Sequence, residues 1–395
     1  MKILVLAWEF PPRIVGGISR HVAELYPEIV NLGHEVHLIT IALPQAPDRE
    51  VVQGIWVYRV PVPETDNFPA WVEGMNHSMI TCALALETTF DLIHGHDWLV
   101  AKASIELAQK LNIPLISTIH ATEYGRNNGI HTDGQRHIHL QEISLTQASQ
   151  RVIVCSHYMQ GEIDRALGCP PAKSRVIFNG LNPSRVAPSG DLAHNLPDLR
   201  RKYAQPDEAI VYYVGRITYE KGIYVLLNAA PKILFAMHDR VKFVLIGTGT
   251  AYSILLQRQA WDLGIYHKTI FTGFMGEEDL YRFQAIADCA VFPSLYEPFG
   301  IVALESFAAG VPVVVSDTGG LPEVVKHRET GIVTKVNDQE SLAQGIIEIL
   351  QNPDLAQQLT RNARRDLQER FAWTKLAQQT VAVYGEVYKL GAVPC

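Results

Sequence analysis

Short apolar runs rich in β-branched residues alternate with amphipathic helical patterns along most of this 395-residue chain. In the first half the predicted strands span residues 2–7, 35–40, 55–60, 91–94, 114–120, 151–154 and 175–178. The helix after the first strand is indicated by Ile18, Val22, Leu25 and Ile29, which recur at helical spacing. Strands of this kind, each followed by a helix, predict a parallel sheet covered by helices on both faces.

The alternation is interrupted once. Residues 180–206 collect Pro, Ser, Asn and Asp without periodicity, which predicts a linker between domains. Predicted strands then resume at 209–214, 241–246, 269–271, 289–292, 311–315 and 331–334, and residues 353–390 are expected to be helical throughout. Because the chain is also too long for one ordinary core, the pattern predicts two consecutive doubly wound α/β domains.

Composition excludes several classes of function. The net charge is −7, so neither a nucleic acid nor an anionic membrane surface is an expected partner. The apolar run at residues 1–7 stops at Glu9 and is interpreted as a first strand rather than a signal peptide, and no stretch is long enough for stable membrane insertion. Five cysteines without a pairing pattern indicate reduced thiols and a cytoplasmic protein.

Residues 294–305, Ser-Leu-Tyr-Glu-Pro-Phe-Gly-Ile-Val-Ala-Leu-Glu, hold the most specific chemical signal. A predicted strand ends at Phe292, a loop carries Glu297, and a helical pattern beginning at Gly300 carries Glu305. A helix N-terminus offers free N–H groups and a partial positive charge, which favour an anion such as a diphosphate. This arrangement predicts a binding site for a phosphorylated, hydroxyl-rich ligand.

Two cations are expected beside this loop. Arg216 follows the predicted strand ending at Val214, and Lys221 lies at the start of the next helix. Arg216 supplies a planar fork and Lys221 a compact charge, and both fall at the carboxyl edge of the second sheet. Fixed cations of this kind can neutralise a diphosphate without a metal ion.

Glu-x7-Glu with Pro-Phe-Gly after the first glutamate, together with Gly-Arg…Glu-Lys-Gly at residues 215–222, resembles the donor site of retaining glycosyltransferases of family 4. The resemblance covers essentially the whole chain. It implies the GT-B fold, an α/β architecture in which two doubly wound Rossmann-like domains face each other across a cleft. The implied domains are residues 1–184 on the acceptor side and 207–374 on the donor side, with a helix at about 375–395 crossing back to the first.

The resemblance also implies roles for individual residues. The implied catalytic residues are His120, Arg216, Lys221 and Glu297. The implied donor-binding residues are Gly16, Gly17, Gly247, Gly273, Phe299, Gly300, Ile301, Val302 and Glu305. Arg216 and Lys221 would hold the diphosphate, and Glu305 the ribose hydroxyls. Glu297 and His120 would contact the sugar, with His120 beside its 6-hydroxyl.

The first half resembles glycogen and starch synthases in two places. His94-Gly95-His96-Asp97-Trp98 is similar to their His-Asp-Trp element, which implies that Asp97 binds the acceptor. His120-Ala-Thr-Glu-Tyr-Gly-Arg is similar to members that use nucleotide-glucose donors. Many such synthases have Lys-x-Gly-Gly in the glycine loop where this chain has Ile14-Val15-Gly16-Gly17, so one phosphate-facing cation is missing. Arg13 or Arg20 are the candidates to replace it.

No metal or other cofactor is expected. The chain lacks the Asp-x-Asp pattern of metal-dependent transferases, and the pair His94 and His96 has no evident third zinc ligand at useful spacing. The predicted function is therefore retaining, metal-independent transfer of glucose or a similar hexose from a nucleoside-diphosphate sugar, ADP- or UDP-glucose, to an α-glucan or small glucoside. Two alternatives stay open: a family 4 hexosyltransferase of exopolysaccharide or glycolipid assembly, and a nucleotide-sugar-binding protein without transfer activity.

Overall fold

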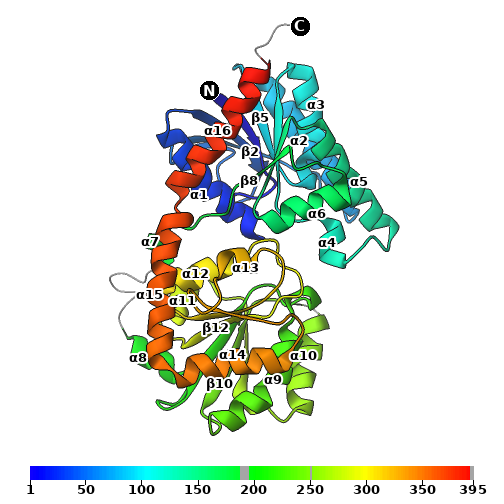
Figure 1. Cartoon of the computed structure of the whole chain (residues 1–395). Helices are drawn as coiled ribbons and strands as arrows, with labels where there is room; N and C mark the ends of the chain where they lie inside the picture. The colour runs from blue at the N-terminus through cyan, green and yellow to red at the C-terminus, as the bar shows by residue number, and fades with distance from the viewer. Residues whose placement is uncertain (187–194, 250, 392–395) are drawn as a thin grey trace. The chain divides into compact units, whose positions relative to one another are not determined.

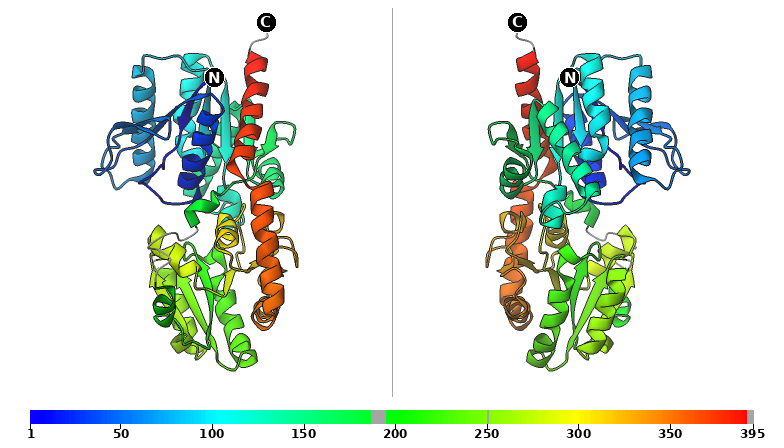
Figure 2. Two further views of the ribbon diagram at one scale, coloured as in Figure 1. Left: turned by 90° about the vertical axis from the view of Figure 1, so that its left-hand side faces the viewer. Right: turned by 90° about the vertical axis from the view of Figure 1, so that its right-hand side faces the viewer.

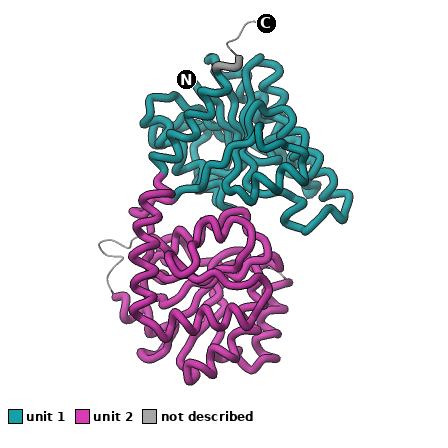
Figure 3. The backbone as a smooth tube through the Cα atoms, in the orientation of Figure 1, with its two compact units in different colours: residues 1–180, 373–395 teal, residues 181–372 magenta. Residues whose placement is uncertain are grey.

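The structure is a computed structural model that describes residues 1–186, 195–249 and 251–391. It forms two compact units, Met1–Gly180 with Trp373–Cys395, and Leu181–Ala372 (Figure 3). We call these the N-terminal unit and the C-terminal unit. Each has its own sheet flanked by helices (Figure 2). The prediction of two doubly wound Rossmann-like domains is confirmed.

The N-terminal unit (Figure 1) is built on a sheet of eight strands. The order of these strands is β3-β4-β2-β1-β5-β6-β7-β8. The strands are β1 (Lys2–Leu6), β2 (Glu35–Ile41), β3 (Arg49–Val52), β4 (Ile55–Val60), β5 (Leu92–His96), β6 (Leu115–Ile119), β7 (Arg151–Val154) and β8 (Ser174–Val176). All neighbours pair in parallel except β3, which is antiparallel to β4. The carboxyl ends of β1, β5 and β6 therefore lie at one edge of the sheet.

The helices of this unit are α1 (Gly17–Asn31), α2 (Phe68–Ala85), α3 (Ala101–Leu111), α4 (Glu123–Asn127), α5 (Asp133–Ala148), α6 (His157–Leu167) and α16 (Trp373–Gly391), with a 3₁₀ turn, η1 (Trp98–Val100). Helix α16 packs on α1, although the two are far apart in sequence. Val22, Leu25 and Ile29 are buried, as the helical spacing predicted, and they share a core with Tyr384 and Val387. This contact makes the end of the chain part of the N-terminal unit.

The C-terminal unit has a six-stranded parallel sheet with the order β11-β10-β9-β12-β13-β14. Its strands are β9 (Ala209–Val214), β10 (Val241–Ile246), β11 (Thr269–Gly273), β12 (Cys289–Phe292), β13 (Val313–Ser316) and β14 (Ile332–Thr334). Its helices are α7 (Pro183–Val186), α8 (Leu196–Arg201), α9 (Ile223–Ala236), α10 (Ala251–Asp262), α11 (Glu277–Gln284), α12 (Ile301–Ala309), α13 (Leu321–Val324), α14 (Gln339–Gln351) and α15 (Pro353–Arg370), with 3₁₀ turns η3 (Tyr219–Lys221) and η4 (Tyr266–Lys268).

Some features differ from the sequence-based expectations. Strand β3 was not predicted, and the helical region expected at 353–390 is broken at Phe371 and Ala372, where the chain passes from one unit to the other. The predicted linker at 180–206 contains α7 and α8, and its residues 187–194 lie outside the described part of the chain. The described cysteines, Cys82, Cys155, Cys169 and Cys289, are free thiols.

Candidate functional site

In the C-terminal unit, the structure brings two of the predicted catalytic residues into direct contact. Lys221 ends η3, after β9, and Glu297 lies in the loop after β12. Because β9 and β12 are parallel neighbours, their carboxyl ends meet at the same sheet edge. The Lys221 Nζ donates to Glu297 Oε2 at 2.8 Å, and the two side chains are only 17% and 14% exposed. The site thus contains a shielded ion pair rather than two solvated charges.

The Glu297 loop is held by backbone contacts on both sides. The amide of Leu295 donates to the carbonyl of Glu220 at 2.8 Å, which ties the loop to the Lys221 turn. The amide of Gly320 donates to the carbonyl of Glu297 at 2.9 Å. At Gly319, with φ of +58°, a Cβ would lie 1.9 Å from that same carbonyl, so only glycine fits. The Gly319-Gly320 pair was not among the predicted site residues, yet it positions one of them.

Helix α12 begins directly after this loop. Gly300 is its N-cap with φ of +105°, and the predicted donor-binding residues Ile301 and Val302 form its first turn. First-turn amides have no partner within a helix and so are available to an anion. Glu305 lies one turn further along and is 1% exposed. The predicted geometry of an anion-friendly helix start with a carboxylate behind it is present.

The remaining predicted residues of this unit lie at the same sheet edge. The amide of Gly247, after β10, donates to the carbonyl of Gly273, at the end of β11, at 2.8 Å. Arg216 follows β9; its guanidinium is 57% exposed and lies 3.4 Å from Glu220. Phe299 is buried beside α12. Arg216 therefore differs from Lys221 in being solvated and only loosely paired.

In the N-terminal unit, Asp97 and His120 are joined through the backbone. They follow the neighbouring parallel strands β5 and β6. Asp97 Oδ1 accepts from the backbone amide of His120 at 2.7 Å. Burial raises the pKa of Asp97 to about 7, although that amide lowers it. Asp97 thus fixes the position of His120, while its predicted contact with an acceptor stays a prediction.

The glycine loop before α1 is anchored by a residue that sequence reasoning missed. Glu9 is buried, and its Oε2 accepts from the amides of Val15 at 2.7 Å and Gly16 at 2.9 Å. Burial raises the pKa of this carboxyl, and the two amides lower it. The Gly16 amide therefore already donates to Glu9 and is not available to a phosphate. Gly17 is the first residue of α1, where an amide has no hydrogen-bond partner within the helix.

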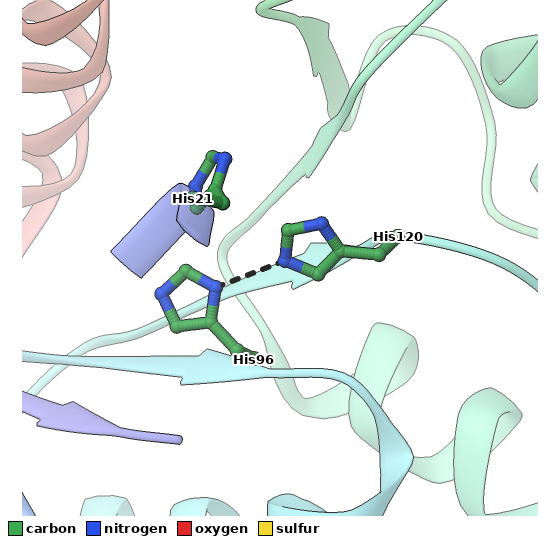
Figure 4. Close-up of side chains that lie close together, drawn as sticks. All are labelled: His21, His96 and His120. Carbon is green, nitrogen blue, oxygen red and sulfur yellow. Dashed lines mark hydrogen bonds between the residues drawn. The ribbon is translucent and has the colours of Figure 1, made fainter. Parts of the chain in front are cut away.

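Around His120 the structure gathers histidines that the sequence did not link. His120 Nε2 and His96 Nδ1 share a hydrogen bond of 3.1 Å, and the ring of His21, from α1, lies 4.8 Å from that of His120 between centroids (Figure 4). Burial lowers the pKa of both His21 and His120 to about 3 and that of His96 well below its usual value. All three imidazoles are neutral at neutral pH. His94 is fully buried in the core.

A cavity of about 460 Å³ opens beside the first strand of the same unit. Its lining includes the aromatic side chains of Trp8, Phe68 and Trp71 and the cation Arg13. The Arg13 guanidinium lies 5.2 Å from the centre of the Trp8 ring, within the range of a cation–π contact. Aromatic faces of this kind bind the apolar faces of sugar rings. Arg13 had been identified as a candidate from the sequence, but none of these aromatic residues had.

Comparison with known proteins decides the family. Residues 15–185 match the family described as Glycosyltransferase Family 4, and residues 197–366 match the one described as Glycosyl transferases group 1. The chain is 37% identical over 385 residues to an uncharacterized glycosyltransferase of Methanocaldococcus jannaschii, covering 97% of this chain and 98% of the relative. The chain belongs to glycosyltransferase family 4.

Further similarities agree with this membership. The family 4 chain is 35% identical over 404 residues to a glycogen synthase of Mycobacterium tuberculosis, covering 97% of this chain and 94% of the relative. Its fold is that of the sucrose-phosphate synthase of Thermosynechococcus elongatus, with a TM-score of 0.83, 24% identity, and coverage of 98% and 99%. The expected GT-B fold and the family are confirmed.

Each matched region contains the candidate site residues of one unit. The first contains Asp97, His120 and His21, and the second contains Lys221 and Glu297. Trp8 and Arg13 lie before the first region, so the aromatic cavity lies partly outside the sequence match. None of the helices in the described part of the chain combines the length and the apolar character that crossing a membrane requires.

Proposed function

We propose that this family 4 enzyme transfers glucose, or a similar hexose, from a nucleoside-diphosphate sugar to a hydroxyl of an α-glucan or small glucoside, with retention of configuration and without a metal ion. The observation that carries the proposal is the shielded ion pair of Lys221 with Glu297 directly before the first turn of α12. Lys221 supplies a cation that can bind a phosphate, and Glu297 supplies a carboxylate that can accept hydrogen bonds from sugar hydroxyls. Both lie at a helix start that favours anions.

Fixed positive groups in the C-terminal unit would take the place of a metal ion in this reaction. When the glycosidic bond to the diphosphate breaks, negative charge develops on the leaving phosphate. Fixed groups that already point at this charge stabilise the transition state without reorganisation. Lys221, the exposed guanidinium of Arg216 and the first-turn amides of α12 supply such groups. The donor is expected to be ADP- or UDP-glucose, with Glu305 on the ribose and Gly247 and Gly273 beside the base.

Retention by attack on the same face of the sugar is supported by the hydrogen bonds of two buried carboxylates in the N-terminal unit. Asp97 and Glu9 each accept from backbone amides, so both are committed to holding loops rather than presented as nucleophiles. We therefore assign the acceptor proton to the leaving phosphate, with attack on the same face of the sugar. Neutral His120 contacts the sugar, and the protein's part is to position reactants and exclude water.

The aromatic cavity supports a carbohydrate acceptor. Trp8 and Trp71 offer ring faces, and the amphipathic character of Trp suits sugars, which have both apolar faces and hydroxyl edges. Arg13 in the same lining favours a second candidate acceptor, a phosphorylated sugar, because a guanidinium binds phosphate through two parallel hydrogen bonds. Exopolysaccharide or glycolipid assembly is less well supported, because the net charge of −7 disfavours an anionic lipid surface.

A donor-by-acceptor screen tests the proposal. Purified protein is incubated with ADP-, UDP- and GDP-glucose against maltooligosaccharides, free glucosides and hexose phosphates, and the product linkage is determined by NMR. We expect α-linked product and the same rate with EDTA. A β-linked product contradicts retention, and EDTA inhibition that is reversed by added Mg²⁺ contradicts metal independence. Nucleoside-diphosphate binding without turnover of any donor would favour the non-catalytic alternative. The free thiols support a reducing, cytoplasmic location, which fractionation of cells would test.

A further inference from the structure

Three histidines from separate elements of the N-terminal unit bring ring nitrogens together at the carboxyl edge of its sheet (Figure 4). His21 lies on α1, His96 ends β5, and His120 directly follows β6. One ring nitrogen from each lies within 4.8 Å of the other two. We propose that His21, His96 and His120 form a binding site for one divalent transition-metal ion, with Zn²⁺ as the ion that they fit best.

The distances suit such an ion. Zn–N bonds of about 2.0–2.1 Å place tetrahedral ligand atoms about 3.3 Å apart. His96 Nδ1 and His120 Nε2 are 3.1 Å apart, so two ligands already have this spacing. The His21 ring nitrogen must move at most roughly 1.5 Å closer to the other two ligand nitrogens. A rotation of the ring within its broad χ2 minimum allows this movement.

The surroundings of His21 leave the correct nitrogen available. Its Nδ1 lies 2.8 Å from Oδ1 of Asn179. A carbonyl oxygen only accepts, so Nδ1 carries the hydrogen and the lone pair is on Nε2. That Nε2 is buried and has no hydrogen-bond partner among the described residues. A histidine whose other nitrogen is held by an oxygen acceptor is the usual arrangement around a bound metal.

His96 has a partner of the same kind. The Tyr26 hydroxyl lies 2.7 Å from His96 Nε2 and 2.9 Å from His94 Nδ1. With Nε2–H of His96 donating to the Tyr26 oxygen, Tyr26 donates in turn to His94, and Nδ1 of His96 presents its lone pair. Without an ion, Nε2–H of His120 donates to His96 Nδ1; when an ion binds, the His120 hydrogen is carried on Nδ1 and Nε2 becomes a ligand. In His21 and His96 the ligand atom is thus left basic by a neighbour that satisfies the opposite nitrogen.

The chemistry of the ligands selects the ion. Three neutral imidazoles suit zinc, copper, nickel and cobalt, whereas Mg²⁺ and Ca²⁺ prefer oxygen ligands. The site is therefore distinct from the Mg²⁺ or Mn²⁺ site of a metal-dependent transferase, and it is compatible with metal-independent transfer.

Occupancy of this site has a consequence that rests on the proposed function. His120 is the residue assigned to the donor sugar, and an ion on its Nε2 removes that nitrogen from the sugar. Zn²⁺ therefore acts as an inhibitor that competes with the donor, and a chelator reverses the inhibition. Binding of the ion itself does not depend on this assignment.

Calorimetric titration of Zn²⁺ into chelator-stripped full-length protein tests the site. We expect one ion per chain, with visible absorption of tetrahedral Co²⁺ as a second readout. His21→Ala should weaken binding by about 100-fold or more, and Asn179→Ala by about 10-fold, the range seen when an outer partner of a ligand is removed. His77→Ala, which removes an exposed histidine on α2, should leave the affinity unchanged.

His21→Gln serves as a second variant if the alanine form does not fold, and the melting temperature without metal shows which variants are intact. Equal Zn²⁺ affinity of the wild type and a folded His21 variant overturns the proposal, as does the absence of one-to-one binding in the wild type. Tight, His21-dependent binding without inhibition supports the metal site and instead overturns the role of His120 in donor binding, so the two ideas fail separately.

Discussion

Lys221 and Glu297 carry opposite charges on two different loops, and each shields the other from solvent. In the proposed reaction, a donor phosphate that enters this position would meet Lys221, a cation that Glu297 already holds in place. Once Lys221 turned to the phosphate, Glu297 would be available to the sugar hydroxyls. Pre-set charges of this kind lower the cost of reorganising the site during the reaction.

Lys221→Ala should reduce kcat by about 100-fold or more, because removal of one fixed donor to a developing negative charge has costs of this order. The variant should remain folded, which its melting temperature checks. Lys232→Ala is the matched control, because Lys232 also pairs with a glutamate, Glu340, but on an exposed surface. Equal kcat for Lys221→Ala and the wild type would contradict the diphosphate assignment.

Glu142→Gln should alter how stability depends on pH. Burial, together with the nearby charges of Asp97 and Glu123, raises the pKa of Glu142 to about 8, although the amide of Glu123 and the charge of Arg126 lower it. His139 Nδ1 lies 3.7 Å from Glu142 Oε2. The folded protein therefore keeps a proton that the unfolded chain loses near pH 4.5. Wild-type stability should fall relative to the glutamine variant by up to about 1.4 kcal/mol per pH unit between about pH 5 and 8.

Urea unfolding at several pH values measures this difference. The variant keeps an oxygen in the position of Oε1, which accepts from the Glu123 amide at 2.8 Å, so the two proteins should be similarly stable near pH 5. Parallel stability curves for the two proteins up to pH 9 would show that Glu142 ionises normally in the folded state.

Individual residues differed in how well the sequence could predict them. Lys221 and Glu297 each follow a strand in a distinctive motif, and neighbouring parallel strands bring such positions together. His21 and Glu9 lie outside any such motif, because their partners come from other elements. His21 is one polar residue on the buried face of α1, and only the assembled sheet shows that it meets His96 and His120.

At the scale of one element, helix α12 depends on its first residue. Gly300 has φ of +105°, and a Cβ there would lie 2.6 Å from Leu321 Cδ2. Gly300→Ala should lower the free energy of unfolding by about 1–2 kcal/mol and weaken nucleoside-diphosphate binding, since the helix start must shift. Denaturant unfolding and a binding titration measure both effects.

Gly276→Ala is the control for this prediction. Gly276 is also an N-cap, of α11, but its φ is −60° and a Cβ would meet nothing within 4 Å. Alanine caps a helix less well than glycine but restricts the unfolded chain, so this change should cost less than about 1 kcal/mol and leave binding unchanged. Similar losses in the two variants would show that the positive φ of Gly300 has no special importance.

The elements were predictable where their burial pattern was complete. Buried strands such as β9 and β12 are nearly uniform apolar runs, and each was identified. Strand β3 was missed because Arg49–Val52 is a short edge strand with alternating exposure, which resembles a loop. The break between α15 and α16 was missed because Phe371-Ala372-Trp373 contains neither Gly nor Pro, and only tertiary contacts end the first helix there.

At the scale of the whole molecule, the end of the chain completes the first unit. Trp373, Leu376 and Tyr384 of α16 are buried in the core of the N-terminal unit, and Glu386 contacts Arg151 at 3.0 Å and Arg175 at 2.7 Å. The sequence could predict two domains from its repeated alternation. The resemblance, rather than any periodicity, implied that the last helix returns, because an amphipathic pattern does not identify its partner.

Deleting residues 373–395 should therefore unfold the N-terminal unit while sparing the C-terminal unit. Burial of each large apolar side chain contributes roughly 1.5–3 kcal/mol, so loss of Trp373, Leu376, Tyr384 and Val387 together approaches the whole stability of an ordinary domain. Calorimetry should show that one unfolding transition disappears and one persists, and hydrogen exchange should locate the loss in β1, β5 and β6. A chain ending at residue 391 is the control and should unfold like the wild type. If the longer deletion left both units protected, α16 would be an accessory to the N-terminal core rather than part of it.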